Sequence, residues 1–154
     1  MTAKLEDAEV ISTIDIEISK ILDQSHKPHY EAFKAHKLWQ MGRKRDTADL
    51  LEQCAQEHPD LEKLSYHAGE YFIELGEFAR ARECLTLCIN TAESSEHHWY
   101  LSAAYLLRAY CAAKLGDDGL AREDLSKVDD VEPLGWIRVE PIISKPSIQA
   151  MITN

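Results

Sequence analysis

Apolar residues recur at helical spacing along most of this chain, starting close to its first residue. Across residues 4–24, Ile11, Ile14, Ile18, Ile21 and Leu22 fall on one face of a helix. The centre of the same stretch, residues 14–18, also alternates isoleucine with acidic residues, as a half-buried strand does. The pattern therefore predicts a helix over residues 4–24 and leaves a strand open for residues 10–20.

Glycine and proline mark the boundaries of the elements that follow. The chain has only 6 glycines and 5 prolines, and runs of Ala, Leu, Glu, Lys and Arg fill the stretches between them. Those five residue types favour helices, whereas glycine and proline interrupt them. The chain from Pro28 onward is therefore predicted to consist of helices joined by short turns.

Three segments after Pro28 share one pattern of a glycine, a small residue and bulky apolar residues at helical spacing. The glycine lets the chain turn through a backbone conformation that side chains disfavour. Small residues let helices approach closely, bulky ones fill the space beside them, and Pro59 and Pro133 end the first and third segments. The shared positions are Met41, Gly42, Thr47, Leu51 and Cys54; then Gly69, Phe72, Leu75, Gly76, Glu77, Phe78, Ala81, Leu85 and Cys88; then Leu115, Gly116, Asp117, Ala121, Leu125 and Val128.

In these residues the chain resembles the tetratricopeptide-repeat (TPR) family, whose unit is a helical hairpin of 34 residues. Thr47 and Ala81 are 34 residues apart. Ala81 and Ala121 are 40 residues apart, and the excess lies in residues 91–100, which predict a longer loop or an extended helix start. The resemblance covers residues 28–133.

The resemblance implies an all-α fold in one domain over residues 1–154, built as a right-handed superhelical stack of about three TPR-like hairpins. The hairpins are expected at residues 28–61, 62–95 and 102–135, after the N-terminal helix and before a C-terminal tail at 136–154. Within the tail, the proline-broken segment Trp136–Pro146 is expected to pack across the last hairpin. Ser147 is expected to N-cap a short final helix through Ile148 and Met151.

The resemblance also implies a concave groove lined by the first helix of each hairpin. Aromatic side chains among charged ones are typical of a binding surface; the alternative is that Trp39, Tyr66 and Tyr110 simply pack between helices. The best-known TPR groove clamps a peptide carboxylate with Lys and Asn side chains, and Glu70 and Glu74 argue against that specificity here. The groove positions carried over are His29, His36, Trp39, Gln40, Tyr66, Glu70, Ile73, Glu74, Leu106, Tyr110 and Lys114.

Charge narrows the class of partner. The formal net charge is -10, with Lys+Arg 17 against Asp+Glu 27, which opposes binding to nucleic acid or anionic lipid and favours a basic partner. Acidic residues predominate between Asp49 and Leu101, where the middle hairpin would attract such a partner. A separate basic patch is expected, and solvated surfaces remain the alternative for both regions. The basic patch comprises Lys34, Lys37, Arg43, Lys44 and Arg45.

The cysteines and histidines show no pattern that indicates chemistry. His29 and His36 are two helical turns apart, about 10.5 Å, which is too far for a shared zinc ion. His97 and His98 fall in the longer loop and are expected to face solvent. No phosphate-binding loop, nucleophile elbow or His-Glu-x-x-His motif occurs, so we expect no catalysis, no cofactor and no metal. Four cysteines in apolar helical patterns, without a Cys-x-x-Cys pair, predict core thiols: Cys54, Cys84, Cys88 and Cys111.

A cytoplasmic location is expected. Glu6, Asp7 and Glu9 stand where a signal peptide needs a basic start, and no run approaches the roughly 18 apolar residues of a membrane span.

The function predicted is protein binding. The chain is similar to small bacterial immunity-type TPR-like proteins, which implies an inhibitor of a cognate, basic toxin. The alternative is a type III secretion chaperone for an effector or translocator segment, since such chaperones also join an N-terminal helix to three TPR-like hairpins.

Overall fold

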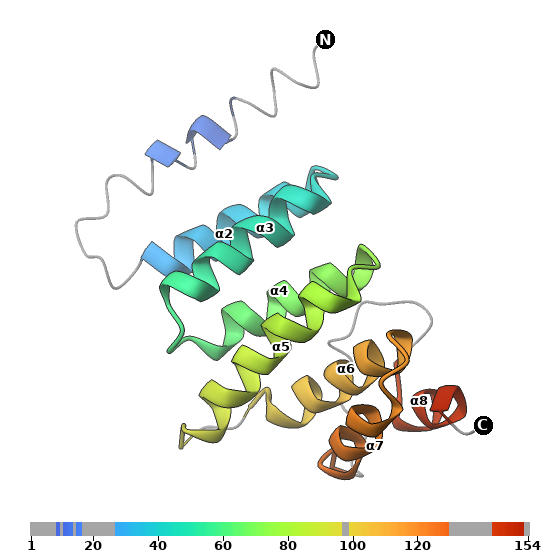
Figure 1. Ribbon diagram of the computed structural model, residues 1–154. Coiled ribbons are helices and arrows are strands. Elements are labelled where there is room, and N and C mark those ends of the chain that lie inside the picture. Colours follow the sequence, from blue (N-terminus) through green and yellow to red (C-terminus); the bar gives the residue numbers. More distant parts are fainter. Residues whose placement is uncertain are drawn as a thin grey trace.

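Helices account for the architecture, and each of them packs on the next along the chain (Figure 1). The computed structural model describes residues 9, 11–13, 15–16, 27–96, 99–129 and 143–152. These residues form helices and turns without a β-strand, which confirms the all-α prediction. Residues 11–13 and 15–16 are helical, in favour of the helix over the strand; the rest of 4–24 lies outside the described residues.

The helices from residue 27 to 126 form three consecutive pairs. In each pair the two helices pack side by side, and the second helix also packs against the first helix of the next pair. A last helix packs against both helices of the third pair. The bounds are α2 Lys27–Gln40 with α3 Lys44–Glu57, α4 Glu62–Glu74 with α5 Phe78–Glu93, α6 Leu101–Lys114 with α7 Asp118–Ser126, and finally α8 Lys145–Ile152.

The turn inside each pair is built on a glycine, as the sequence predicted. After α2, Gly42 N–H donates to the carbonyl of Trp39 and Arg43 N–H to that of Leu38, both at 2.9 Å. This pair of bonds is the Schellman ending, which needs a left-handed residue at the glycine position. The same two bonds recur after α4 and α6. The three glycines accordingly have positive φ: Gly42 at 77°, Gly76 at 75° and Gly116 at 78°.

The longer connection between α5 and α6 accounts for the 40-residue spacing. α5 runs to Glu93 and α6 begins at Leu101, so both a long helix and a turn contribute to the excess. His97 and His98, expected to face solvent there, lie outside the described residues.

The core lies along the contacts between successive helices. Ala81 and Ala121 are fully buried, as are Phe72 and Leu85, so small and bulky residues alternate across the contact as predicted. Gly69 marks the closest approach of α4 to α5. A Cβ atom at this position would lie 2.7 Å from Cγ of Leu85.

Replacing Gly69 with alanine is expected to destabilise the chain. Pushing a methyl group against the branch carbon of a buried leucine costs about 1–3 kcal/mol, which outweighs a gain of up to about 1 kcal/mol in helix propensity. Gly119 is the matched control, because its Cβ would meet only Asp117 Oδ1 at 3.9 Å. Gly119→Ala should stabilise the chain slightly. Urea denaturation measures both free energies of unfolding, and the same sign for both would contradict the close contact.

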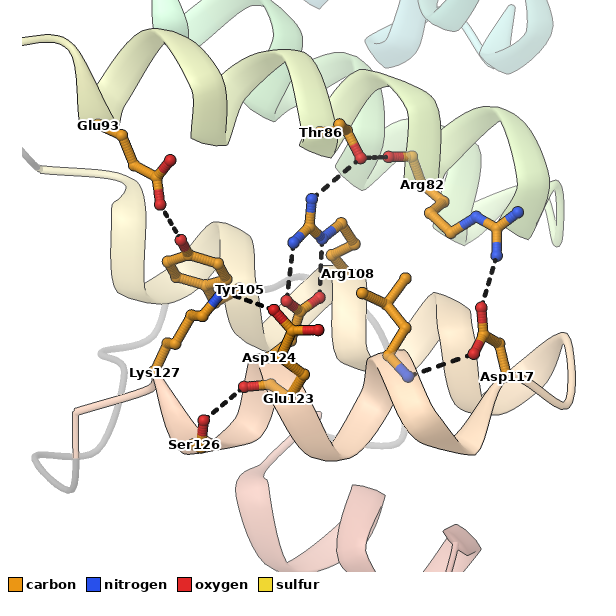
Figure 2. Close-up of polar contacts among 11 residues, drawn as sticks. Arg82, Thr86, Glu93, Tyr105, Arg108, Asp117, Glu123, Asp124, Ser126 and Lys127 are labelled. Carbon is orange, nitrogen blue, oxygen red and sulfur yellow. Dashed lines mark hydrogen bonds and ion pairs between the residues drawn. The ribbon is translucent and has the colours of Figure 1, made fainter.

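A buried ion pair links α6 to α7, and its arginine also forms a hydrogen bond to α5. Arg108 on α6 donates through Nε and Nη2 to the two carboxylate oxygens of Asp124 on α7, each at 2.7 Å. Its third nitrogen, Nη1, donates to the Thr86 hydroxyl on α5 at 3.2 Å. Figure 2 shows the guanidinium between these two partners. Nearby, Tyr105 donates to Glu93, a second link between α6 and α5.

The four cysteines are core residues, as predicted. Each is buried and none forms a disulfide. Burial raises the pKa of the Cys54 thiol to about 11 and those of Cys84, Cys88 and Cys111 to about 12. The thiols therefore stay protonated at neutral pH and are poor nucleophiles.

The final helix starts earlier than predicted. Ser147 was expected as its N-cap, but α8 begins at Lys145 and the capping residue is Ser144. Ser147 N–H donates to Ser144 Oγ at 3.2 Å, and Ser144 N–H donates to Ser147 Oγ at 2.9 Å. Ser147 is thus the second member of a reciprocal capping pair. Of the segment Trp136–Pro146, residues 136–142 lie outside the described residues.

Candidate binding groove

A groove of about 440 Å³ lies between α2 and α4, the first helices of the first two pairs. The residues that α2 contributes are spaced about one helical turn apart, and so are those that α4 contributes. One residue of α3, Leu51, also lines the groove. The lining is His29, Ala32, Phe33, His36, Leu51, Lys63, Leu64, His67, Glu70, Tyr71 and Glu74.

The groove has an apolar part that includes two aromatic rings. Phe33 is 50% exposed, an unusual position for a phenylalanine in a folded chain. Tyr71 is half-buried and packs against Trp39, with ring centroids 4.3 Å apart. Leu64, which also lines the groove, is buried. This part of the groove therefore offers ring faces and aliphatic surface to an incoming side chain.

Glu70 is the charged residue held most firmly in the groove. It is only 8% exposed, and His67 Nδ1 lies 2.8 Å from its Oε2 atom. Because a carboxylate accepts hydrogen bonds, His67 is the donor, with the proton on Nδ1. The other oxygen, Oε1, is buried, and no described residue donates to it. Glu70 thus carries a buried acceptor with unused capacity.

The remaining polar groups on the α2 side are engaged with neighbours. His29 Nδ1 lies 2.6 Å from Lys63 Nζ, so a hydrogen bond joins α2 to α4 near one end of the groove. His36 Nε2 lies 3.0 Å from Gln40 Nε2, one turn further along α2. Because Lys63 Nζ can only donate, His29 Nδ1 accepts that bond.

Within the part of the chain that the structure describes, no three His, Cys, Asp or Glu side chains come together so as to hold a metal ion. None of the described helices has both the length and the apolar character that crossing a bilayer requires.

Comparison of the chain with protein-family models, curated proteins and solved structures gives no match.

Four residues that the sequence assigned to a groove come together here: His29, His36, Glu70 and Glu74. Gln40 is exposed beside His36. Three others do not face a groove. Tyr66, Ile73 and Leu106 are almost fully buried, which corrects their assignment to an exposed surface. They lie on α4 and α6, helices covered by neighbours on more than one side.

The remaining predicted residues belong to aromatic contacts between helices. Trp39 packs on Tyr71, and Lys44 Nζ lies 5.0 Å from its ring. Tyr110 packs edge-on against Phe78 at 5.8 Å, with Lys114 Nζ 5.5 Å from the Tyr110 ring. Trp39 and Tyr110, with the buried Tyr66, thus follow the packing interpretation that the sequence left open.

Sequence reasoning missed seven residues of the groove. All but Leu51 lie within one helical turn of a predicted residue, so the helical repeat itself could have found them. The signal was incomplete because the register of a neighbouring helix decides which of two adjacent positions faces the groove. The missed residues are Ala32, Phe33, Leu51, Lys63, Leu64, His67 and Tyr71.

Some of the acidic residues between Asp49 and Leu101 form ion pairs with basic residues of the same chain. Arg80 on α5 contacts Glu52 and Asp49 on α3, and it lies over the ring of Phe72 at 4.1 Å. Glu77 pairs with Arg45, a member of the predicted basic patch. These ion pairs leave less unpaired acidic surface on α3 and α5 than the sequence suggested.

The basic patch is likewise divided among local partners. Lys34 pairs with Asp15 of the N-terminal segment. Arg43 pairs with Asp46 at 2.7 Å, and Lys37 Nζ lies 5.4 Å from the Phe33 ring. The patch therefore does not act as a free cationic surface in the way the sequence alone suggested.

Proposed function

We propose that this chain is a non-catalytic protein-binding module whose groove between α2 and α4 receives a segment of a partner protein. The observation that carries the proposal is the groove itself, with a half-exposed phenylalanine beside a buried carboxylate. Aromatic surface next to a desolvated polar group is the combination found at the centres of protein interfaces. A volume of about 440 Å³ suits a few side chains of a peptide segment.

We further propose that the three helix pairs form a right-handed superhelical stack of TPR type. Support comes from the same Schellman turn at Gly42, Gly76 and Gly116 and from the small residues buried at equivalent places, Thr47, Ala81 and Ala121. In such a stack the first helices of successive pairs line the inner surface, and a groove lined mainly by α2 and α4 would lie on that side.

The partner proposed is a basic protein, and the role that of a cytoplasmic immunity-type inhibitor that neutralises a toxin. The net charge of -10 favours rapid association with a basic surface, and the spare acceptor at Glu70 favours a donor. Inhibition would then follow from occlusion, without any chemical step in this chain.

A secretion chaperone is the second candidate, and one observation favours it. Such chaperones carry a helix after their hairpins, and α8 is a helix that packs on α6 and α7. The candidates differ in what the bound partner does. A toxin loses its activity in the complex, whereas an effector segment is kept soluble for export.

Site-specific photocrosslinking tests the proposed function. A benzoylphenylalanine is placed at Phe33 in the groove or, as a control, at the exposed Glu83 on α5. Each variant is co-expressed with the proteins encoded by the neighbouring genes. We expect a crosslinked complex from position 33 and none from position 83. A stable complex that crosslinks equally at both positions, or only at 83, would exclude the groove, and an activity assay of the captured partner separates the two candidates.

A further inference from the structure

We infer that the groove is anchored by a guanidinium group, an arginine side chain of the partner that donates to Glu70. The inference rests on the proposed function and deepens it by naming the chemical group that the groove recognises. Three observations carry it: one oxygen of the buried Glu70 carboxylate has no hydrogen-bond donor among the described residues, aromatic rings line the groove, and a second acidic residue lies one turn away.

The Glu70 carboxylate is desolvated and only half used. Its Oε2 atom accepts from His67 at 2.8 Å, while Oε1 is buried and accepts from no described residue. Leaving a charged acceptor unpaired away from water costs free energy that a partner's donor would recover. Such an atom in a native fold calls for an explanation, and Glu70 lines a groove through which a donor can arrive.

Access requires the Glu70 side chain to shift, because Oε1 is covered in the free chain. A turn about the terminal χ3 torsion alone only exchanges the two carboxylate oxygens, so the side chain as a whole must move toward the groove. That movement exchanges the hydrogen bond that His67 donates to Oε2 for bonds donated by the incoming group.

The surroundings favour a cation over a neutral donor. Glu74 lines the same groove one turn along α4, which adds to the negative potential. The ammonium of Lys63 contacts His29 on the opposite helix. An arriving cation thus meets the half-used Glu70 carboxylate in a partly desolvated site, where charge-assisted hydrogen bonds are about twice as strong as neutral ones.

The wall favours arginine over lysine. The rings of Phe33 and Tyr71 line the groove, and a planar guanidinium stacks on an aromatic face while it donates in its own plane. On Phe33 it would replace Lys37, whose Nζ lies 5.4 Å from the ring centroid in the free chain. The apolar side chains of Ala32 and Leu64 can cover the aliphatic stem. A compact ammonium would use neither the stacking faces nor the fork of donors as fully.

Titration of the full chain with amino-acid derivatives tests the anchor. The probes are Nα-acetyl-arginine amide, its neutral isostere Nα-acetyl-citrulline amide, and Nα-acetyl-lysine amide. Binding is followed by the NMR shifts of the Glu70 carboxyl carbon and the His67 imidazole. We expect saturable shifts at both residues with the arginine derivative and at least about tenfold weaker binding of the citrulline derivative. The lysine derivative should fall between the two.

Glu70→Gln keeps the size of the side chain and one acceptor, and it should abolish the preference for arginine over citrulline. Glu83→Gln, at an exposed position on α5, should preserve it. Equal binding of arginine and citrulline in the wild-type chain, a preference that survives Glu70→Gln, or equal binding of lysine and arginine would each overturn the inference. The wild-type comparison alone decides if Glu70→Gln does not fold.

The two proposals fail separately. Crosslinking from position 33 without an arginine preference would leave the groove as the binding site and remove its anchor. An arginine preference that depends on Glu70, without any crosslink from position 33, would leave a guanidinium site and remove the protein-binding function.

Discussion

Replacing Arg108 with alanine is expected to lower the free energy of unfolding by about 3–5 kcal/mol, because the change strands a buried carboxylate. Asp124 has no exposed surface, and both of its oxygens accept from Arg108 at 2.7 Å. Without the guanidinium, that charge stays buried between α6 and α7 with its main partner gone. The loss extends to α5, because Arg108 also donates to Thr86.

Urea denaturation followed by circular dichroism measures this loss, and Arg82→Ala is its matched control. Arg82 on α5 also makes a contact between elements, with Asp117 at the N-cap of α7, but at 3.5 Å and with both side chains well exposed. An exposed pair of this kind contributes at most about 1 kcal/mol. The double variant Arg108→Leu with Asp124→Leu should recover much of the stability, because it removes both charges. Similar losses for Arg82→Ala and Arg108→Ala would contradict the role of the buried pair.

The turns could be predicted from the sequence because their cause is local. A helix that reverses within two or three residues needs a left-handed position at its end, and glycine meets that need most readily. Gly42, Gly76 and Gly116 therefore marked the three turns in advance, and all three have positive φ. The capping of α8 was placed wrongly because Ser144 and Ser147 are both suitable N-caps, and only the observed hydrogen bonds choose between them.

The groove could be predicted only in part, because burial depends on how many neighbours a helix has. α2 is covered by α3 and presents His29 and His36 to the groove, as expected. α4 is contacted by α3, α5 and α6, so the residues expected on its open face are largely covered. Tyr66, for example, packs against Tyr100 with ring centroids 4.8 Å apart. Sequence spacing gives the face of a helix but not what covers it.

Ion pairs between residues on different helices could not be predicted from the sequence. The acidic excess between Asp49 and Leu101 suggested an open negative surface. The contacts of Arg80 with Asp49 and Glu52, which come from a different helix, show that part of this charge is paired internally. What distinguishes Glu70 from these residues is its burial, at 8% exposed, together with an oxygen that accepts no hydrogen bond from a described residue. Neither property can be read from composition.

Replacing Phe72 with alanine is expected to cost about 3–5 kcal/mol of unfolding free energy, whereas the same change at Phe33 should cost less than about 1 kcal/mol. Phe72 is fully buried, so its loss leaves a cavity between α4 and its neighbours. It also supports the guanidinium of Arg80 at 4.1 Å from its ring, and Arg80 in turn joins α5 to α3. Phe33 is half exposed in the groove and has much less packing to lose.

The two substitutions also separate stability from binding. Phe33→Ala should leave thermal unfolding nearly unchanged and weaken the complex captured by crosslinking from a second groove position, His36. Phe72→Ala should lower the unfolding temperature clearly, with binding retained in whatever fraction stays folded. Thermal denaturation and a binding isotherm on both variants distinguish these outcomes. A large loss of stability from Phe33→Ala would place that ring in the core, and the groove would then lose the exposed aromatic surface on which the proposed function depends.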